Sequence, residues 1–110
     1  MQIDHRDVGG VSVLDVVGDL AVGDHEDVFR RHMQTLAARG QRDIVLNLAR
    51  VTRVDSVCIG LMVATHVSLG NRGGRLRLAN LQRRVRQQLE IAKLDEVLHI
   101  YGSEAEALAP

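Results

Sequence analysis

The sequence predicts an α/β protein with a mixed sheet of four to five strands and helices packed mainly on one face. Beyond residue 20, short β-branched apolar runs alternate with longer segments that carry apolar residues at helical spacing. Such alternation favours a largely parallel sheet covered by its connecting helices. The 110 residues suit one domain, and no repeat, low-complexity tract or linker interrupts them. We therefore expect a single domain over residues 1–110.

The first twenty residues predict a pair of strands. Residues 11–20 are rich in valine and alternate apolar with polar side chains, which is typical of a strand. Residues 2–8 are a candidate partner strand, and Gly9 and Gly10 between the two indicate a turn.

Residues 24–40 predict the first helix. Asp24 is a candidate N-cap, acidic residues fill the first turn, and Gly40 is a candidate C′ residue. An apolar stripe at helical spacing lies between them and consists of Val28, Phe29, Met33 and Leu36.

The middle of the chain predicts a strand, a helix and another strand. Residues 43–51 are a short apolar run after a turn, which indicates a buried strand. Residues 57–70 form an apolar run that is too long for an ordinary strand, so they predict a helix. Residues 75–81 alternate leucine with Arg75 and Arg77, which predicts a strand with one face in solvent.

The remainder of the chain predicts a helix, a strand and a short helix. Residues 81–92 carry a helical stripe made of Leu81, Val85, Leu89 and Ala92. Residues 97–101 are a candidate last strand. Residues 103–109 predict a terminal helix in which Ser103 is the N-cap and Glu106 completes a capping box.

Composition and charge exclude several classes of protein. A single cysteine, Cys58, forms no internal disulfide, so we expect an intracellular, cytoplasmic protein. No signal-like segment opens the chain, and no apolar run approaches the ~20 residues that span a bilayer. The formal net charge of +0 gives no reason to expect direct contact with nucleic acid.

Basic residues nevertheless gather in one part of the sequence. Between Ser56 and Leu89 there is no acidic residue, and six arginines occur there: Arg72, Arg75, Arg77, Arg83, Arg84 and Arg86. They indicate either a solvated loop and helix face or a basic surface for an acidic partner or an anionic head group.

The pair Asp55-Ser56 stands directly before the apolar helix predicted at 57–70. A serine there caps the helix by accepting a hydrogen bond from a free N–H, and an aspartate complements the positive end of the helix dipole. We expect Ser56 to be at or beside the N-cap and to keep its hydroxyl within reach of solvent. The alternative to a plain cap is a regulated site.

The predicted helix at 57–70 is more apolar than one buried stripe requires. One row can face the core and contains Cys58, Met62, Thr65 and Leu69. The opposite row contains Ser56, Gly60, Val63 and Val67 and would expose apolar surface beside a hydroxyl. Such a surface often marks a partner site, although another element of the same chain could also cover it.

In this order and spacing, five segments resemble the STAS domain family, specifically the bacterial anti-sigma factor antagonists. The resemblance covers roughly residues 8–108. The segments are VVGDL, DIVLNLARV, VDSVCIGLMV, RGGRLRLANL and KLDEVLHIYGSEAEAL. The resemblance implies a STAS-like fold and a binding module that is not an enzyme.

The family also implies a mechanism of regulation. Its members bind an anti-sigma factor that is a serine kinase, and this binding frees a sigma factor. The kinase binds ATP and phosphorylates a serine directly after the aspartate of a D-S-[S/T]-G-L-G motif. The motif matches Asp55 to the aspartate, Ser56 to the phosphoacceptor and Gly60 to the second glycine, whereas Val57 and Cys58 replace the residues between.

The resemblance and the outer apolar row of the predicted helix together indicate a partner surface around this motif, and no cofactor or metal is expected in the chain itself. Its residues are Asp19, Asp55, Ser56, Gly60, Val63 and Val67. Asp19 belongs to the strand end Gly18-Asp19-Leu20, after which Ala21 stands where the family often has an acid. A monomer or weak dimer is expected.

Other functions find little support in the residues. The five histidines form no triad order with Ser56, no pair has metal spacing, and no glycine-rich phosphate loop is present. Cys58 lies inside an apolar segment and is best interpreted as a small buried hydrophobe. The remaining alternative is a STAS domain that is not phosphorylated and serves as a scaffold or soluble subunit in a signalling or transport assembly.

Overall fold

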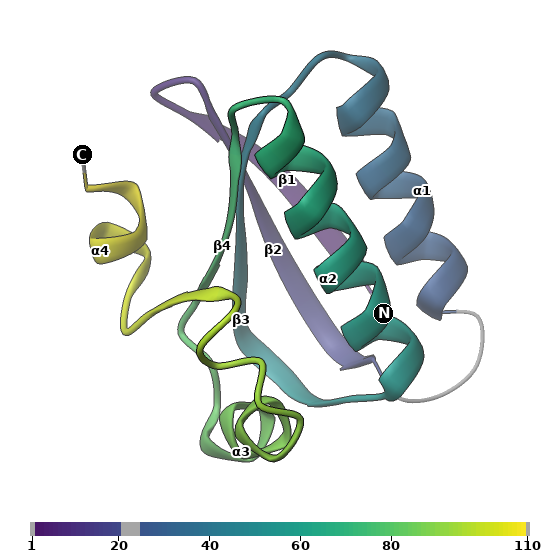
Figure 1. The fold of residues 1–110 in the computed structure, drawn as a ribbon, viewed down its shortest axis with the longest axis vertical. Coiled ribbons are helices and arrows are strands. Elements are labelled where there is room, and N and C mark those ends of the chain that lie inside the picture. Colours follow the sequence, from purple (N-terminus) through teal and green to yellow (C-terminus); the bar gives the residue numbers. More distant parts are fainter. Residues whose placement is uncertain (1, 21–24, 110) are drawn as a thin grey trace.

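The computed structural model describes residues 2–20 and 25–109, without the side chains of residues 19, 20, 25 and 26. Its five-stranded sheet has the order β1-β2-β3-β4-β5 (Figure 1). The strands are β1 (Gln2–Val8), β2 (Val11–Leu20), β3 (Asp43–Val54), β4 (Arg75–Ala79) and β5 (His99–Tyr101). β1 runs antiparallel to β2, and every later neighbour is parallel, so the predicted mixed sheet is confirmed.

The helices in the described ranges lie mainly on one face of the sheet, as predicted. They are α1 (His25–Ala38), α2 (Ser56–Asn71), α3 (Arg83–Ile91) and α4 (Glu104–Leu108). Figure 1 shows α1 and α2 side by side along the sheet, with α4 on its other side. Apolar side chains of α1, α2 and α3 join one core, whereas Ala107 of α4 belongs to a second cluster.

The two cores follow from the alternation of side chains along the strands. Leu76 and Leu78 of β4 point into the larger core, between the sheet and the first three helices. Ala79 points into the smaller cluster beneath α4. Fully buried residues of the larger core include Leu14, Phe29, Ile44, Leu46, Leu48, Cys58, Met62, Leu76, Leu78, Val85 and Leu89.

The face of β4 predicted to be in solvent is in fact partly covered, and this expectation was wrong for Arg77. The Arg77 side chain is buried because α4 packs over it. Its guanidinium donates a 2.5 Å hydrogen bond to the carbonyl oxygen of Ala107 and lies 3.6 Å from a carboxylate oxygen of Asp43. Arg75 remains exposed. The alternation of leucine and arginine correctly predicted a strand. It does not indicate that a helix thirty residues further on covers one face of that strand.

Polar contacts attach the start of α4 to the sheet. Arg6 of β1 donates to Asp15 at 2.6 Å and to Glu104 at 2.5 Å, so one guanidinium joins two carboxylates. Asn47 of β3 adds a 3.3 Å bond to Glu104. The hydrogen bonds from Arg6 hold the pKa of Glu104 below its ordinary value, because they favour the ionised carboxylate.

The predicted helix ends are largely confirmed. Gly40 has φ +77°, and its N–H donates to the carbonyl of Ala37, as expected of a C′ glycine. Ser103 caps α4 by accepting from the Glu106 N–H at 3.1 Å. The Glu106 carboxylate accepts from the N–H of Gly102 instead of that of Ser103, so the capping box is shifted by one residue. The proposed cap Asp24 lies outside the described residues.

Other boundaries differ by a few residues. β3 continues three residues beyond the predicted end and stops at Val54, because it keeps pairing with the end of β2. α3 begins at Arg83 and ends at Ile91, so Leu81 packs against the core from outside the helix. β5 is limited to His99–Tyr101.

Candidate partner-binding site at the start of helix α2

The junction of β3 and α2 places Asp55 at the N-cap and Ser56 at the first helical position. Asp55 has extended backbone angles, and its Oδ1 accepts from the Cys58 N–H at 2.8 Å. The expectation that Ser56 makes the capping bond was therefore wrong. Both residue types cap well, and the choice depends on where the preceding strand ends.

This correction leaves the Ser56 hydroxyl free for other chemistry. Ser56 is exposed, and its side chain has no hydrogen-bond partner within the described ranges. The neighbouring Asp55 carboxylate uses one oxygen for the cap. An exposed hydroxyl therefore stands at the N-terminus of a helix, beside a negative charge.

The rows predicted for α2 are confirmed in outline. Cys58, Met62 and Leu69 are buried in the core. On the outer side, Ser56 and Gly60 are exposed, and Val67 is 52% exposed. Val57 belongs to the same outer surface and is 44% exposed, whereas Val63 is half-buried at its edge. Valines therefore remain in solvent along the whole length of this helix.

The end of β2 lies beside the same junction. Gly18 pairs with Val51 and Leu20 pairs with Val54, so the backbone of Asp19 runs next to the end of β3. The sequence prediction had grouped Asp19 with Asp55, which directly follows β3, the neighbour of β2. The side chain of Asp19 and the whole of Ala21 lie outside what the structure describes.

Two glutamines that the sequence analysis did not single out form hydrogen bonds to β3 near this junction. Gln82 is the residue before α3, and Gln88 lies within α3. The pairing of β3 with β4 ends at Asn47 and Ala79. Beyond that point Gln82 donates to the Ala49 carbonyl at 2.9 Å. Gln88 donates to the Val54 carbonyl at 2.7 Å and accepts from the Val54 N–H at 3.1 Å. These side chains thus replace the missing strand next to β3.

No sequence signal could have identified Gln88. It stands among polar residues of an amphipathic helix, and its partner is 34 positions away in the sequence. Its effect on the site is direct, because Val54 is the residue before the N-cap Asp55. The position of Asp55 and Ser56 therefore depends on α3 as well as on β3.

The six arginines between residues 72 and 86 do not form one basic surface. Arg72 donates to the carbonyls of Ala37 and Gln41, near the loop that follows α1. Arg77 is buried beneath α4. The remaining three beyond β4 lie exposed on α3: Arg83, Arg84 and Arg86. The arginines thus lie before, within and beyond β4.

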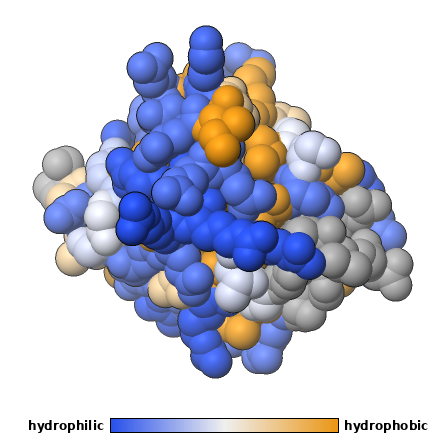
Figure 2. Space-filling model, turned by 90° about the horizontal axis from the view of Figure 1, so that it is seen from below, coloured by the Kyte–Doolittle hydropathy of each residue, from blue (hydrophilic) through white to orange (hydrophobic). Residues whose placement is uncertain are grey.

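Figure 2 shows the surface seen from below, where apolar side chains stand among hydrophilic ones. The large apolar residues exposed in the described chain are Val8, Val57, Val67, Ile91 and Val97.

The described residues contain no cluster of three or more histidine, cysteine, aspartate or glutamate side chains that could hold a metal ion. None of the described helices is long and apolar enough to cross a bilayer.

A mixed five-stranded sheet, with helices mainly on one face and a solvent-facing serine at the start of its second helix, defines a small α/β domain. The chain belongs to the STAS domain family, whose model matches residues 2–107. The family resemblance found in the sequence is thereby confirmed.

Two relatives and one solved structure also resemble this chain. A Paenibacillus polymyxa protein named anti-sigma F factor antagonist is 27% identical over 98% of this chain and 92% of its own length. A Thermotoga neapolitana homolog of the protein TM1081 is 34% identical over 64% of this chain, and the match spans only 62% of that relative. A structure of an anti-sigma factor antagonist from Mycobacterium paratuberculosis superposes with a TM-score of 0.86, covering 97% of this chain and 90% of the other at 22% identity, which shows the shared fold.

Proposed function

We propose that this protein is an anti-sigma factor antagonist. It binds an anti-sigma factor that is also a serine kinase, through the outer surface of α2, and so releases a sigma factor. The relatives named anti-sigma factor antagonists support this role. The observation that carries it is the exposed, unbonded hydroxyl of Ser56 at the start of a helix with Val57 and Val67 in solvent.

Phosphorylation of Ser56 would regulate this binding. A phosphate adds a charge of about −1.5 to −2 at neutral pH. Free N–H groups at the start of a helix accommodate such an anion, so the fold should survive the modification. On the outer side of α2, however, the charge lies beside valines and Asp55 and must lose water when a partner binds. A hundredfold loss of affinity requires only about 2.8 kcal/mol.

The kinase supplies the chemistry of transfer. Phosphoryl transfer requires bound Mg-ATP and groups that position the phosphates, and in the proposed complex the partner contributes both. This chain contributes the acceptor hydroxyl, the Asp55 cap that fixes the backbone beside it, and the docking surface that includes Gly60, Val63 and Val67. Asp19 is assigned to the same surface because its strand adjoins the junction.

A pull-down from native lysate with Ser56→Asp tests the proposed switch. The aspartate should weaken recovery of the kinase at least tenfold, whereas Ser56→Ala should bind normally. Gln87→Glu is the control, because it adds the same charge at an exposed position on α3, away from α2. The partner is then incubated with wild type and Mg-ATP, and intact mass should show one added phosphate that Ser56→Ala does not take.

Two results would contradict this proposal in different ways. Absence of added phosphate, with equal binding by wild type and Ser56→Asp, would leave an unregulated STAS scaffold. Recovery of a transport or signalling assembly that contains no anti-sigma factor would refute the antagonist role itself. Of the pull-down and the mass measurement, the mass measurement is the more informative, because Val57 and Cys58 replace the small residues that the family usually has beside the acceptor serine.

A further inference from the structure

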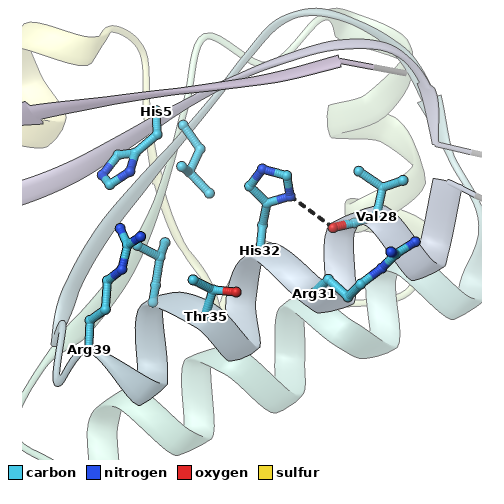
Figure 3. Close-up of a pocket in the computed structure, with 8 residues that line it drawn as sticks. His5, Val28, Arg31, His32, Thr35 and Arg39 are labelled. Atoms are coloured by element: carbon cyan, nitrogen blue, oxygen red, sulfur yellow. Dashed lines mark hydrogen bonds between the residues drawn. The ribbon is translucent and has the colours of Figure 1, made fainter.

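A second candidate site lies between α1 and the hairpin of β1 and β2. It is a hollow of about 450 Å³ lined by residues of these three elements. This volume falls within the range of small-molecule sites in proteins. Figure 3 shows His5 of β1 pointing down toward α1, while His32 and Arg39 of α1 point up toward the strands.

Apolar side chains line part of this hollow. Leu14 of β2 and Leu36 of α1 contribute side chains that are buried in the main core. Val28 lies at one end of the hollow and is half-buried. Leu14 and Leu36 are 0% and 3% exposed, so the apolar surface that a ligand can reach is mainly that of Val28. An apolar part of a ligand would displace water there, which is favourable.

The polar side chains around the hollow include two arginines, two histidines and Thr35. Arg39 is exposed, and its guanidinium has no acidic partner among the described side chains. The Nδ1 of His32 lies 3.0 Å from the Val28 carbonyl and donates to it, so Nε2 of the neutral ring is an acceptor, and His32 is not counted among the groups that bind an anion. The carboxylate of Asp7 is already engaged, since it lies 2.9 Å from His5 Nε2 and accepts from Ser12 at 3.3 Å.

We propose that this hollow binds a small amphipathic anion, namely a carboxylate with a short hydrocarbon body. The carboxylate lies at Arg39, and the hydrocarbon packs against Val28 above the buried Leu14 and Leu36. The ligand class follows from the pairing of an unneutralised guanidinium with this apolar surface, because Arg forms strong charge-assisted bonds to carboxylates. This inference does not depend on the proposed role of Ser56.

Octanoate and octanol form a matched pair of probes, since they share the hydrocarbon and differ in charge. We expect octanoate to shift the amide resonances of β1, β2 and α1 in ¹⁵N-labelled protein, with a dissociation constant of about 1 mM for a ligand of this size. Octanol should bind at least several-fold more weakly. Equal binding of the two probes would overturn the proposal, as would shifts confined to α2 or no shifts at all.

Variants of the hollow make the test specific. Arg39→Gln should weaken octanoate binding about tenfold, the loss of one charge-assisted hydrogen bond, without changing octanol binding. The matched control is Arg30→Gln, because Arg30 lies on the same helix but pairs with Asp27 at 3.1 Å and does not line the hollow. Thr35→Phe should fill the space and block both probes. Octanoate binding that survives both Arg39→Gln and Thr35→Phe in folded protein would refute the site.

Discussion

The side-chain amide of Gln88 forms two hydrogen bonds with the main chain of Val54, at 2.7 and 3.1 Å. Val54 is only 1% exposed, so water cannot replace these bonds if the glutamine is lost. The pair joins α3 to the last residue of β3. Through this contact the third helix fixes the backbone from which Asp55 and Ser56 are presented.

Replacing Gln88 by leucine should therefore destabilise the protein by about 2 kcal/mol, because a buried N–H and a buried carbonyl lose their partners. The amide of Val54 should also exchange faster with solvent deuterium. Gln87→Leu is the matched control, since Gln87 is the adjacent residue of the same type and is exposed. Equal urea midpoints for the two variants would show that the Gln88 contact contributes nothing.

The assignment of the N-cap predicts different effects for two neighbouring alanine substitutions. Asp55→Ala should lower the free energy of unfolding by about 1 kcal/mol, because the Cys58 N–H loses its acceptor. Ser56→Ala should change it by less than ~0.5 kcal/mol, as expected for an exposed side chain without a partner. Urea unfolding of both variants measures the difference, and the reverse order would return the cap to Ser56.

The proposed docking surface predicts that a charge on the outer side of α2 weakens binding. Val67→Lys should reduce affinity for the kinase at least tenfold, or about 1.4 kcal/mol, because the lysine must lose water at an apolar contact. Val63→Lys should act in the same direction. Ile91→Lys is the control, since Ile91 is 84% exposed but lies on α3. A loss of affinity caused by Ile91→Lys alone would move the interface away from α2.

The contact between Arg6 and Glu104 predicts a loss of stability in acid. Arg6 lowers the pKa of Glu104 below its ordinary value of 4.5, so below pH 4.5 the unfolded chain binds more protons at this residue than the folded chain. The stability that Glu104 contributes is thus complete above pH 4.5 and is lost as the pH falls through its lowered pKa.

Unfolding measured between pH 6 and 3 should show this dependence. Glu104→Gln should be less stable than wild type at pH 6, and the difference should shrink toward pH 3, because below pH 4.5 the unfolded wild-type chain is stabilised by binding a proton at Glu104. Glu96→Gln, at an exposed position between α3 and β5, is the control. A constant difference between wild type and Glu104→Gln over this range would contradict the assigned cause.

The sequence by itself determined the order of strands and helices, the two rows of α2 and the family. Each of these depends on patterns within a few residues, such as the alternation in residues 75–79 or the stripe of Cys58, Met62 and Leu69. Such patterns reflect which side of an element is apolar, and that property is local. The Asp55-Ser56 pair before an apolar helix was likewise visible without coordinates.

Only the tertiary structure decided which residue of that pair caps the helix and what covers each face of the sheet. β3 runs on to Val54 because β2 pairs with it and Gln88 bonds its last residue from 34 positions away, and this length makes Asp55 the cap. Arg77 is buried because α4, held by Arg6 and Glu104, closes over it. These outcomes depend on contacts between residues far apart in the chain. The periodicity of apolar residues does not indicate these contacts, because it reflects only residues that are close together in the sequence.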